Sequence, residues 1–354
     1  MKKINLLEFS NQWSMGGTEK AAQLFMKYID KDKFNVYAAG WRGGPRESLV
    51  RDLGVEMHIE ENQNNMIEWI KSKNIDIVHM HRAGSEEHIL IDTFKKAGVK
   101  CIVEHNIFAQ VDNSSDENEI DKHIFLSNIQ LEMYKQRAGS PRLDKLEALY
   151  YPVETEAFIK KENYSAPIFG RHSRPDMYKW SLVNIQILPI IKAEIPDAKF
   201  HVIGLPDQYR EAIKRIGCED MVVEFPATSD QNEIAKFLNG LTIYTHGAMI
   251  GESFGMVIAE AMSTGLPVIT HRGGDGAQAE LVVDGVNGIV CQENNFKEYA
   301  AALIYLLKNR ETEAVRMGSK GIEFSNKFAA EAITRKLEKI LVDTFNNKTG
   351  SSYN

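Results

Sequence analysis

The sequence has few cysteines and lacks the marks of several protein classes. Cys101, Cys218 and Cys291 are scattered, without C-x-x-C spacing. This pattern excludes a disulfide framework and a cysteine zinc cluster, and it suits a reducing cytoplasm. No apolar run approaches the roughly 18 residues that a transmembrane helix needs. Asn5 and Glu8 interrupt the apolar N-terminal stretch, which favours a first β-strand over a signal peptide. We therefore expect a cytoplasmic protein.

Positive charge is scarcer than negative charge. The chain has 42 Lys and Arg against 49 Asp and Glu, a formal net charge of −7. This balance argues against nucleic acid as a partner, but a local phosphate site stays open because it needs a pocket and not a global field. No basic amphipathic helix indicates membrane binding, and peripheral contact at the inner membrane face stays an open alternative. The sequence does not indicate an oligomeric state.

A chain of 354 residues is long enough for two domains. In both halves β-type apolar runs alternate with helical patterns, which predicts an α/β protein with two doubly wound, Rossmann-like parallel-sheet domains facing across a cleft. We expect an N-terminal domain over 1–155, a C-terminal domain over 156–328, and a terminal helix with a tail over 329–354. Residues 110–119 are acidic and aperiodic, and we expect a mobile loop there.

The stretch 241–269 holds the strongest local pattern. A strand over 241–245 precedes a glycine-bearing loop, and a helical pattern begins at about residue 256. The N–H groups at such a helix start suit an anion such as phosphate. Glu252 lies in the loop and Glu260 inside an otherwise apolar helix, so Glu260 must reach solvent or be held by a hydrogen-bond donor. The alternative is that Glu252 is a helix-start charge and Glu260 a solvated position.

The two glutamates form Glu-x7-Glu, with Ser253-Phe254-Gly255 after the first and Glu-Ala-Met-Ser-Thr-Gly-Leu-Pro-Val around the second. This combination resembles the donor-site signature of the retaining glycosyltransferases of family 4, which have the GT-B fold. The resemblance implies transfer of a sugar from a nucleotide-diphosphate sugar to an acceptor. The N–H groups of this Ser-Phe-Gly turn would bind the diphosphate, Glu260 the ribose, and Glu252 the sugar near its anomeric carbon. Whether Glu252 is also the nucleophile stays open.

The first strand-to-helix turn carries Gly16-Gly17-Thr18-Glu19. Glycines there let a ligand approach the backbone at a helix start. The turn is not G-x-G-x-x-G, so a nicotinamide enzyme is poorly supported. It resembles the Gly-Gly-x-Glu loop of the same family, which implies that Gly16 and Gly17 lie near the donor diphosphate and Glu19 on the acceptor side. A plain tight turn is the alternative.

Three histidines follow two neighbouring predicted strands. His79 and His81 point to the same side at i, i+2 spacing, and His105 ends the next strand. A metal site is conceivable but lacks a third ligand nearby in the sequence, and cleft lining is the alternative. The family resemblance places His81 on the acceptor side and gives His105 a catalytic role beside the donor sugar.

The turn after residues 167–170 carries cations suited to a diphosphate. Family members usually read Gly-Arg and, a few residues later, Lys-Gly. Arg171 matches this pattern, whereas Lys179 lies further along and Trp180 replaces the glycine. The second phosphate cation is therefore Lys179 or Arg174. Residues 273–280 resemble the family's Gly-Gly-x-x-Glu segment with longer spacing, and their role stays open.

Asp30-Lys31-Asp32 is a formal Asp-x-Asp, and we interpret it as a solvated turn. We therefore expect no required metal and no cofactor beyond the nucleotide-sugar donor. The acceptor can be a glycan, a lipid-linked sugar or a small molecule, and the sequence does not distinguish them. Two alternatives remain: a nucleotide-sugar 2-epimerase or phosphorylase of the same fold, and a non-catalytic nucleotide-sugar-binding protein.

Overall fold

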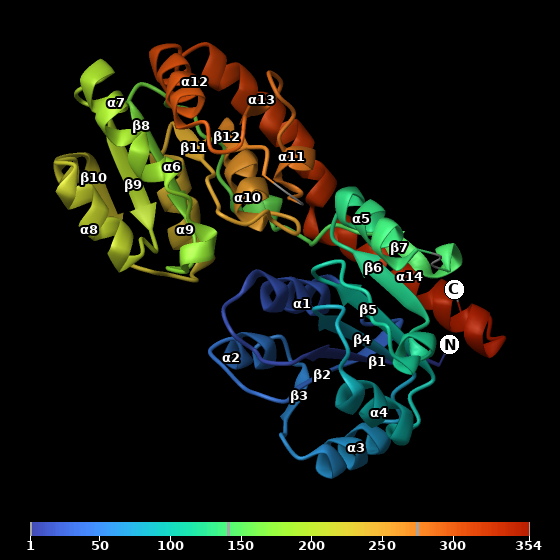
Figure 1. Ribbon diagram of the computed structural model, residues 1–354. Helices are drawn as coiled ribbons and strands as arrows, with labels where there is room; N and C mark the ends of the chain where they lie inside the picture. The colour runs from blue at the N-terminus through green and yellow to red at the C-terminus, as the bar shows by residue number, and fades with distance from the viewer. Residues whose placement is uncertain (1, 140–141, 274–275, 354) are drawn as a thin grey trace. The chain divides into compact units, whose positions relative to one another are not determined.

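The computed structural model describes residues 2–139, 142–273 and 276–353 (Figure 1). The chain divides into two compact units. The N-terminal unit comprises Met1–Val153 and Ala330–Asn354, and the C-terminal unit comprises Glu154–Ala329. Each unit is built on its own parallel sheet, as the alternation of strand and helix patterns predicts.

The N-terminal unit holds a seven-stranded sheet in the order β3-β2-β1-β4-β5-β6-β7. Every neighbouring pair in this sheet is parallel. The strands are β1 (Ile4–Ser10), β2 (Phe34–Gly40), β3 (Glu56–Ile59), β4 (Ile77–Arg82), β5 (Cys101–Asn106), β6 (Lys122–Phe125) and β7 (Leu146–Ala148). The helices are α1 (Gly17–Tyr28), α2 (Glu47–Arg51), α3 (Gln63–Ser72), α4 (His88–Ala97), α5 (Asn128–Ala138) and α14 (Ala330–Thr349), with 3₁₀ turns η1 (Ser115–Glu119) and η2 (Leu143–Lys145).

The two faces of this sheet differ in chemistry because successive strand residues point to opposite sides. One face carries Leu7, Phe9, Val78 and Met80, which pack in one apolar core with buried residues of α3 and α4. The opposite face carries histidines of β4 and β5, whose rings contact Phe25 of α1.

Helix α14 packs beside α1 in the N-terminal unit. Its buried residues include Ile333, Leu337, Leu341 and Phe345, which recur every four residues along one stripe. The backbone N–H of Ala330 donates to the carbonyl of Val153 at 2.9 Å. This bond joins the start of α14 to Val153, the last residue of the unit's first segment. The apolar stripe is the cause of this docking, because it would otherwise face water.

The C-terminal unit holds a six-stranded parallel sheet in the order β10-β9-β8-β11-β12-β13. The strands are β8 (Ile168–His172), β9 (Lys199–Ile203), β10 (Val222–Phe225), β11 (Ile243–Thr245), β12 (Val268–His271) and β13 (Gly288–Cys291). The helices are α6 (Val183–Gln186), α7 (Leu188–Glu194), α8 (Asp207–Arg215), α9 (Gln231–Gly240), α10 (Met256–Thr264), α11 (Gln278–Leu281), α12 (Phe296–Lys308) and α13 (Glu313–Ser325), with 3₁₀ turns η3 (Thr155–Ala157), η4 (Met177–Lys179), η5 (Glu219–Met221) and η6 (Asn326–Phe328).

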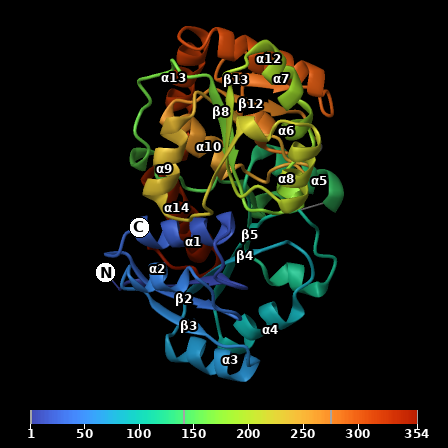
Figure 2. The ribbon, with the colours of Figure 1, turned by 90° about the vertical axis from the view of Figure 1, so that its left-hand side faces the viewer.

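Helices cover both faces of this second sheet. Figure 2 shows α9 and α10 on one side and α6 and α8 on the other, in agreement with their packing contacts. The strand order reverses direction between β8 and β11. In open α/β sheets ligands bind outside the carboxyl ends of the strands at such a reversal. This edge of the sheet is therefore where a site is sought first.

Among the described residues, no helix combines the length and the apolar character needed to cross a bilayer.

Candidate functional site

The loop between β11 and α10 lies at the strand-order reversal of the C-terminal unit. Gly255 caps the start of α10 with φ of 97°. A side chain disfavours this left-handed backbone, so glycine is required for the abrupt change from loop to helix. The buried Phe254 side chain contacts the Phe328 ring at 5.1 Å between centroids and anchors the loop from below. Ser253, the third predicted residue of this turn, is half-buried.

Glu252 lies in this loop between two nitrogen-bearing side chains. Lys179 Nζ is 2.8 Å from Oε2, and His246 Nε2 is 3.4 Å from Oε1. Burial by itself would raise the pKa of Glu252, but His246 and Lys179 outweigh it and hold the pKa well below its usual range. Glu252 is therefore an ionised carboxylate. The side-chain oxygen of Gln278 accepts a hydrogen bond from the backbone N–H of Glu252 at 2.9 Å, which fixes the backbone at that position.

Arg171, predicted as a phosphate ligand, is fully buried behind the same loops. Its guanidinium donates to the carbonyls of Gly247 and, at 2.6 Å, of Lys179. The guanidinium carbon lies 4.4 Å from the centre of the Trp180 ring. Arg171 thus ties the turn after β8 to the loop after β11. These two bonds leave the Nε–H without a hydrogen-bond partner among the described residues.

The sequence allows either Lys179 or Arg174 as the second cation for the phosphates. Lys179 lies against Glu252 with its side chain 23% exposed. The Arg174 side chain is exposed, and its carbonyl accepts the indole N–H of Trp180 at 3.2 Å. Of the two, Lys179 is the one that the structure joins to Glu252.

Glu260 is buried inside α10 and is held by a donor, which is one of the two outcomes that its sequence position allows. His172 Nε2 lies 3.0 Å from Glu260 Oε2. His172 ends β8 and points to the face opposite Arg171, because neighbouring strand residues alternate. The sequence reasoning did not single out His172, although its place directly after Arg171 at a strand end was the available signal.

Unsatisfied buried atoms gather near this edge of the sheet. Among the described residues, buried side-chain atoms without a hydrogen-bond partner include Arg171 Nε, His172 Nδ1, Asn184 Oδ1 and both ring nitrogens of His271. Leaving such a group unpaired costs roughly 1–3 kcal/mol. Several of them close to one strand edge mark a place where water or a ligand completes the hydrogen bonding. His271, the last residue of β12, is a site candidate that the sequence reasoning missed.

The segment over 273–280 follows β12. Gly274 and Asp275 lie outside the described residues. Gln278 is buried, and its contact with the Glu252 amide connects this segment to the glycine loop.

In the N-terminal unit the Gly16-Gly17 turn opens α1. Glu19 is turned back onto this turn, where its Oε1 accepts the hydroxyl of Ser14 at 3.0 Å. A Cβ atom added to Gly16 would lie 2.5 Å from the other carboxylate oxygen of Glu19. Glycine is therefore needed for this close approach, and the loop and Glu19 form one packed group.

His81 and His105 are brought together, as their places on adjacent strands predict. Their rings stack with centroids 5.2 Å apart, and Phe25 of α1 stacks on the His105 ring at 5.6 Å. His105 is fully buried and His81 is 3% exposed. In this unit both side chains are therefore enclosed beneath α1, and neither ring is open to solvent.

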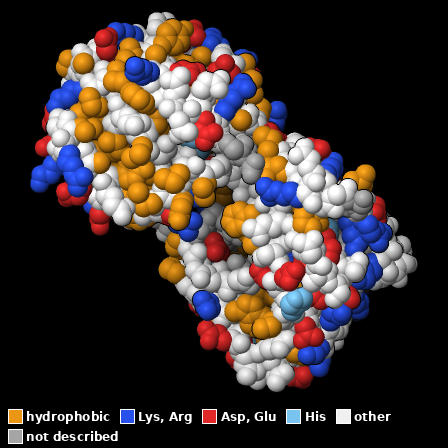
Figure 3. Space-filling model, in the orientation of Figure 1, with side chains coloured by type: hydrophobic (Ala, Val, Ile, Leu, Met, Phe, Trp, Pro, Cys, Tyr) orange, Lys and Arg blue, Asp and Glu red, His pale blue; other side chains and the backbone are white. Residues whose placement is uncertain are grey.

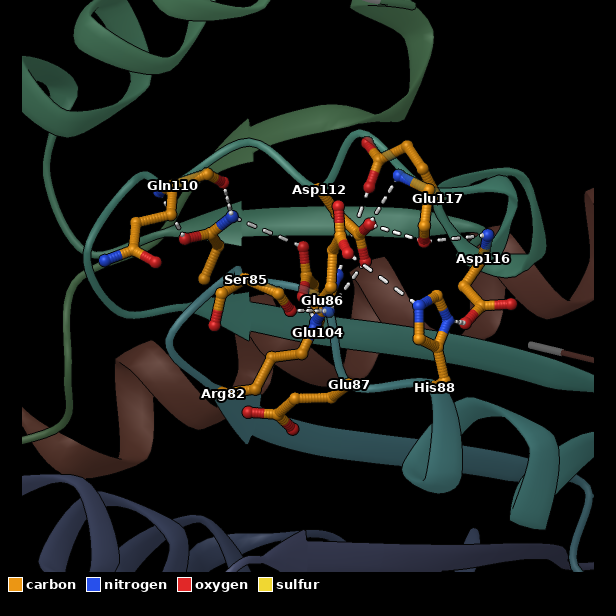
Figure 4. A network of polar contacts seen from close by, with 12 residues as sticks. Arg82, Ser85, Glu86, Glu87, His88, Glu104, Gln110, Asp112, Asp116 and Glu117 are labelled. Atoms are coloured by element: carbon orange, nitrogen blue, oxygen red, sulfur yellow. Dashed lines mark hydrogen bonds and ion pairs between the residues drawn. The ribbon is translucent and has the colours of Figure 1, made fainter.

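A second polar network lies at the carboxyl ends of β4 and β5 (Figure 4). Arg82 is fully buried and pairs with Glu104, and with Asp112 at 3.0 Å. Further along the acidic segment, Asp116 pairs with His88 at 2.6 Å and Glu117 accepts the Tyr134 hydroxyl at 2.7 Å.

The acidic segment 110–119, where the sequence predicts a mobile loop, contains the 3₁₀ turn η1. Its carboxylates Asp112, Asp116 and Glu117 are held by partners from β4, α4 and α5. Those partners are distant in sequence, so local composition could not reveal them.

A hollow of about 660 Å³ in the N-terminal unit lies away from these strand ends, beside α14. Lys and Arg side chains gather near α14 on the face seen in Figure 3. Acids neutralise much of this charge: Lys122 pairs with Glu147 at 3.0 Å and Lys348 with Asp121 at 2.8 Å. The hollow therefore does not compete with the glycine loop as the candidate site.

Comparison with known proteins shows a family match in the C-terminal unit. Residues 173–324 match the family described as glycosyl transferases group 1. A poly(glycerol-phosphate) alpha-glucosyltransferase of Bacillus subtilis is 25% identical over 296 residues, covering 77% of this chain and 39% of the relative. A D-inositol 3-phosphate glycosyltransferase of Corynebacterium glutamicum is 29% identical over 180 residues, covering 48% of this chain and 42% of the relative. The chain spans about two fifths of the length of these curated relatives.

Solved structures match nearly the whole chain. Anabaena HepE in complex with UDP and glucose has a TM-score of 0.79 at 15% identity, covering 96% of this chain and 100% of that one. A glycosyltransferase from Rickettsia africae has a TM-score of 0.80 at 18% identity, covering 99% of this chain and 100% of that one. At such identities the likeness shows the fold, and the GT-B fold expected from the sequence is confirmed.

Proposed function

Because residues 173–324 carry a domain of the glycosyl transferases group 1 family, we propose that this chain transfers a sugar from a nucleotide-diphosphate sugar to an acceptor hydroxyl. The observation that carries the proposal is the ionised Glu252, held by Lys179 and His246 beside the start of α10. The printed description of the HepE structure, with UDP and glucose bound, supports a nucleotide sugar as the class of donor.

In the proposed reaction the bond between the anomeric carbon and the diphosphate oxygen breaks, and a bond from that carbon to the acceptor oxygen forms. The leaving diphosphate gains negative charge and takes up the acceptor proton. Groups that stabilise this growing charge lower the barrier directly. The N–H groups at the start of α10 and the Lys179 ammonium are the candidates, and Arg171 joins them if a phosphate oxygen reaches its unpaired Nε–H.

We assign the two glutamates different tasks. Glu252 is ionised, so it can accept hydrogen bonds from sugar hydroxyls close to the reacting carbon. Glu260 is held by His172. Together the two side chains would exchange hydrogen bonds with the ribose hydroxyls, with the Glu260 carboxylate as the acceptor. Glu260 then contributes to nucleotide binding and little to the chemical step.

The proposal includes retention of the anomeric configuration and independence of a divalent metal at the donor diphosphate. Both rest on the resemblance of the Glu-x7-Glu segment to family 4. The ammonium of Lys179, the guanidinium of Arg171 and the helix start supply positive charge that a metal ion supplies in other transferases. From the N-terminal unit, Gly16 and Gly17 would approach the diphosphate.

In the same proposal Glu19 and His81 lie on the acceptor side. His105 would support the reaction centre from the end of β5. Because the His105 and His81 rings are enclosed, their contribution would pass through the strand-end backbone or require α1 to move.

The proposal is tested by binding and by product analysis. Calorimetry with UDP, GDP and ADP identifies the nucleotide that binds. Lys179→Gln should weaken the binding of that nucleotide. Lys320→Gln, which removes the lysine of an exposed ion pair on α13, should leave the affinity unchanged. The matching nucleotide sugar is then incubated with a panel of acceptors. The NMR coupling constant of the anomeric proton in the product shows whether the anomeric configuration of the donor is retained. Nucleotide binding without turnover of any donor would leave a binding protein. Conversion of donor alone to an epimerised sugar would favour an epimerase.

A further inference from the structure

Four buried polar side chains form a closed group in the N-terminal unit: Glu8 of β1, His79 and His81 of β4, and His105 of β5. Their exposed fractions are 0%, 0%, 3% and 0%. The strands pair so that Glu8 is level with His79, and His81 with His105. The proposed transfer reaction does not use the Glu8 and His79 side chains.

The hydrogen bonds of Glu8 orient two of the imidazoles. His79 Nδ1 lies 2.8 Å from one carboxylate oxygen, and His81 Nε2 lies 3.3 Å from the other. An ionised carboxylate only accepts, so both of these nitrogens carry protons. In a neutral imidazole the other nitrogen is then a bare lone pair.

These lone pairs converge with the third histidine. His79 Nε2 lies 2.7 Å from His105 Nδ1, and one ligand atom from each of the three histidines falls within 4.8 Å of the others. His81 Nδ1, the other bare nitrogen, has the Tyr151 hydroxyl at 3.3 Å. One nitrogen from each of three histidines is thus within reach of a shared ion, and a phenol oxygen lies beside His81.

The group lacks a positive charge to balance Glu8. Among the described residues, the side chains hydrogen-bonded to the Glu8 carboxylate are those of His79 and His81. A cation bound on the far side of both rings would supply that charge. Carboxylate–histidine–metal arrangements are the usual way in which a ligating ring is held in place.

We propose that His79, His81 and His105 bind one divalent transition-metal ion of the zinc class, with Glu8 orienting two of the rings and Tyr151 at the fourth position. Neutral imidazole nitrogens are preferred zinc ligands, and four-coordinate closed sites are typical of structural zinc. The sequence left this site open for want of a third ligand, and the strand pairing supplies it in His105.

The ion requires the rings to move, because the three ligand atoms span up to 4.8 Å and a tetrahedral ion holds its ligands closer together. Two nitrogens on a tetrahedral zinc with bonds of about 2.0–2.1 Å lie about 3.3 Å apart, so His79 and His105 must separate by roughly 0.6 Å. The proton between them moves to His105 Nε2, which can donate to the Leu149 backbone. The imidazoles keep their protons toward Glu8 and Leu149 and release none, whereas Tyr151 gives up its hydroxyl proton to solvent when it ligates as phenolate.

The site would serve the stability of the unit and not the chemical step. The ion would join β1, β4 and β5 beneath α1, whose start carries the Gly16-Gly17 turn. In closed sites the free energy of metal binding is also free energy of folding. The ligand rings are enclosed, so the ion would enter as the chain folds and would exchange slowly.

The experiment is a metal analysis of untagged full-length protein produced in minimal medium supplemented with zinc, and separately with cobalt. We expect stoichiometric zinc by mass spectrometry and the visible absorption of tetrahedral Co²⁺. His81→Gln should lose both signals. His58→Gln is the matched control, since His58 lies in the same unit, stacked on Trp69 outside the cluster, and should keep them.

Folded wild-type protein without metal would overturn the proposal and leave a hydrogen-bonded network only. Metal that persists in His81→Gln and in His105→Gln would equally overturn it. If His81→Gln fails to fold, the wild-type metal content and the cobalt spectrum decide alone. None of these measurements depends on turnover, so they are independent of whether the chain proves to be a transferase.

Discussion

The charge on Glu252 is set by its neighbours, and we predict that transfer depends on it. In Glu252→Gln, Lys179 loses its partner at 2.8 Å, and the sugar loses a charged acceptor, which forms hydrogen bonds about twice as strong as a neutral one. We expect kcat/KM to fall about 100-fold or more, with nucleotide affinity changed far less. Initial-rate kinetics and calorimetry measure the two quantities.

The control for this change is Glu233→Gln, which removes an exposed carboxylate from the first turn of α9 in the same unit. It should leave kcat/KM unchanged. Wild-type kcat/KM in Glu252→Gln would remove Glu252 from the reaction centre and leave it a purely structural partner of Lys179.

His246 gives a pH prediction. It is buried, and burial lowers its pKa to about 4, against roughly 6.5 in an unfolded chain. The unfolded state therefore binds the proton first as pH falls, so stability is present above about pH 6.5 and is lost below it. Between pH 7 and pH 5 the C-terminal unit should lose about 1–2 kcal/mol through this group alone.

Urea unfolding of wild type and His246→Gln at both pH values measures this loss. The variant should be less stable at pH 7 but should show a shallower decline toward pH 5. Equal declines in the two proteins would contradict a neutral buried His246. His201→Gln, at a less buried imidazole of β9 in the same unit, is the control.

At the scale of elements, the strands were predictable and their ends were not. In the sequence, the apolar runs over 75–80 and 99–104 predict two strands, whereas β4 and β5 each end two residues later, at Arg82 and Asn106. The final residues are polar and still buried, because Arg82 pairs with Glu104 across the two strands. A prediction based on apolar residues therefore ends the strand too early, because it does not recognise polar residues that are buried in pairs.

The same limit applies to the candidate site. The sequence singled out Glu252 and Glu260 through the glycine loop and its helix, and Lys179 through the turn after residues 167–170. It could not show that Arg171 donates to the carbonyl of Gly247, which is 76 residues away, or that His172 holds Glu260. Such contacts follow from the order of strands in the sheet, and single-sequence patterns do not contain that order.

The start of α10 yields an element-scale prediction. Gly255→Ala places a side chain at φ of 97°, with its Cβ 3.3 Å from Ile258 Cδ1. We expect a loss of roughly 1–2 kcal/mol of stability and a reorientation of the N–H groups before α10, so that nucleotide affinity falls at least about tenfold. Calorimetry with the nucleotide and thermal unfolding measure both effects.

Gly98→Ala is its matched control. Gly98 has φ of 77° at the end of α4, with no heavy atom within 4 Å of the added Cβ. It should carry a similar backbone penalty in the other unit without any effect on nucleotide affinity. Equal affinity losses in the two variants would mean that the loss reflects general destabilisation and not the loop.

At the scale of the whole molecule, the two units concentrate different chemistry at their strand ends. The C-terminal unit gathers Arg171, Lys179 and the α10 start beside an ionised glutamate, which suits a diphosphate. The N-terminal unit encloses neutral histidines under α1 and acids bound to Arg82. A divalent ion at the diphosphate would duplicate charge that the C-terminal unit already supplies.

Transfer should therefore continue when EDTA is added at the start of the assay, and Mg²⁺ or Mn²⁺ should not increase the initial rate. The proposed histidine-bound ion does not confuse this test, because its ligands are enclosed and it would not leave within minutes. A Mn²⁺-dependent transferase assayed in parallel shows that chelation is complete. Immediate loss of activity with EDTA, restored by Mg²⁺ or Mn²⁺, would place a metal at the diphosphate and make Lys179 an auxiliary charge.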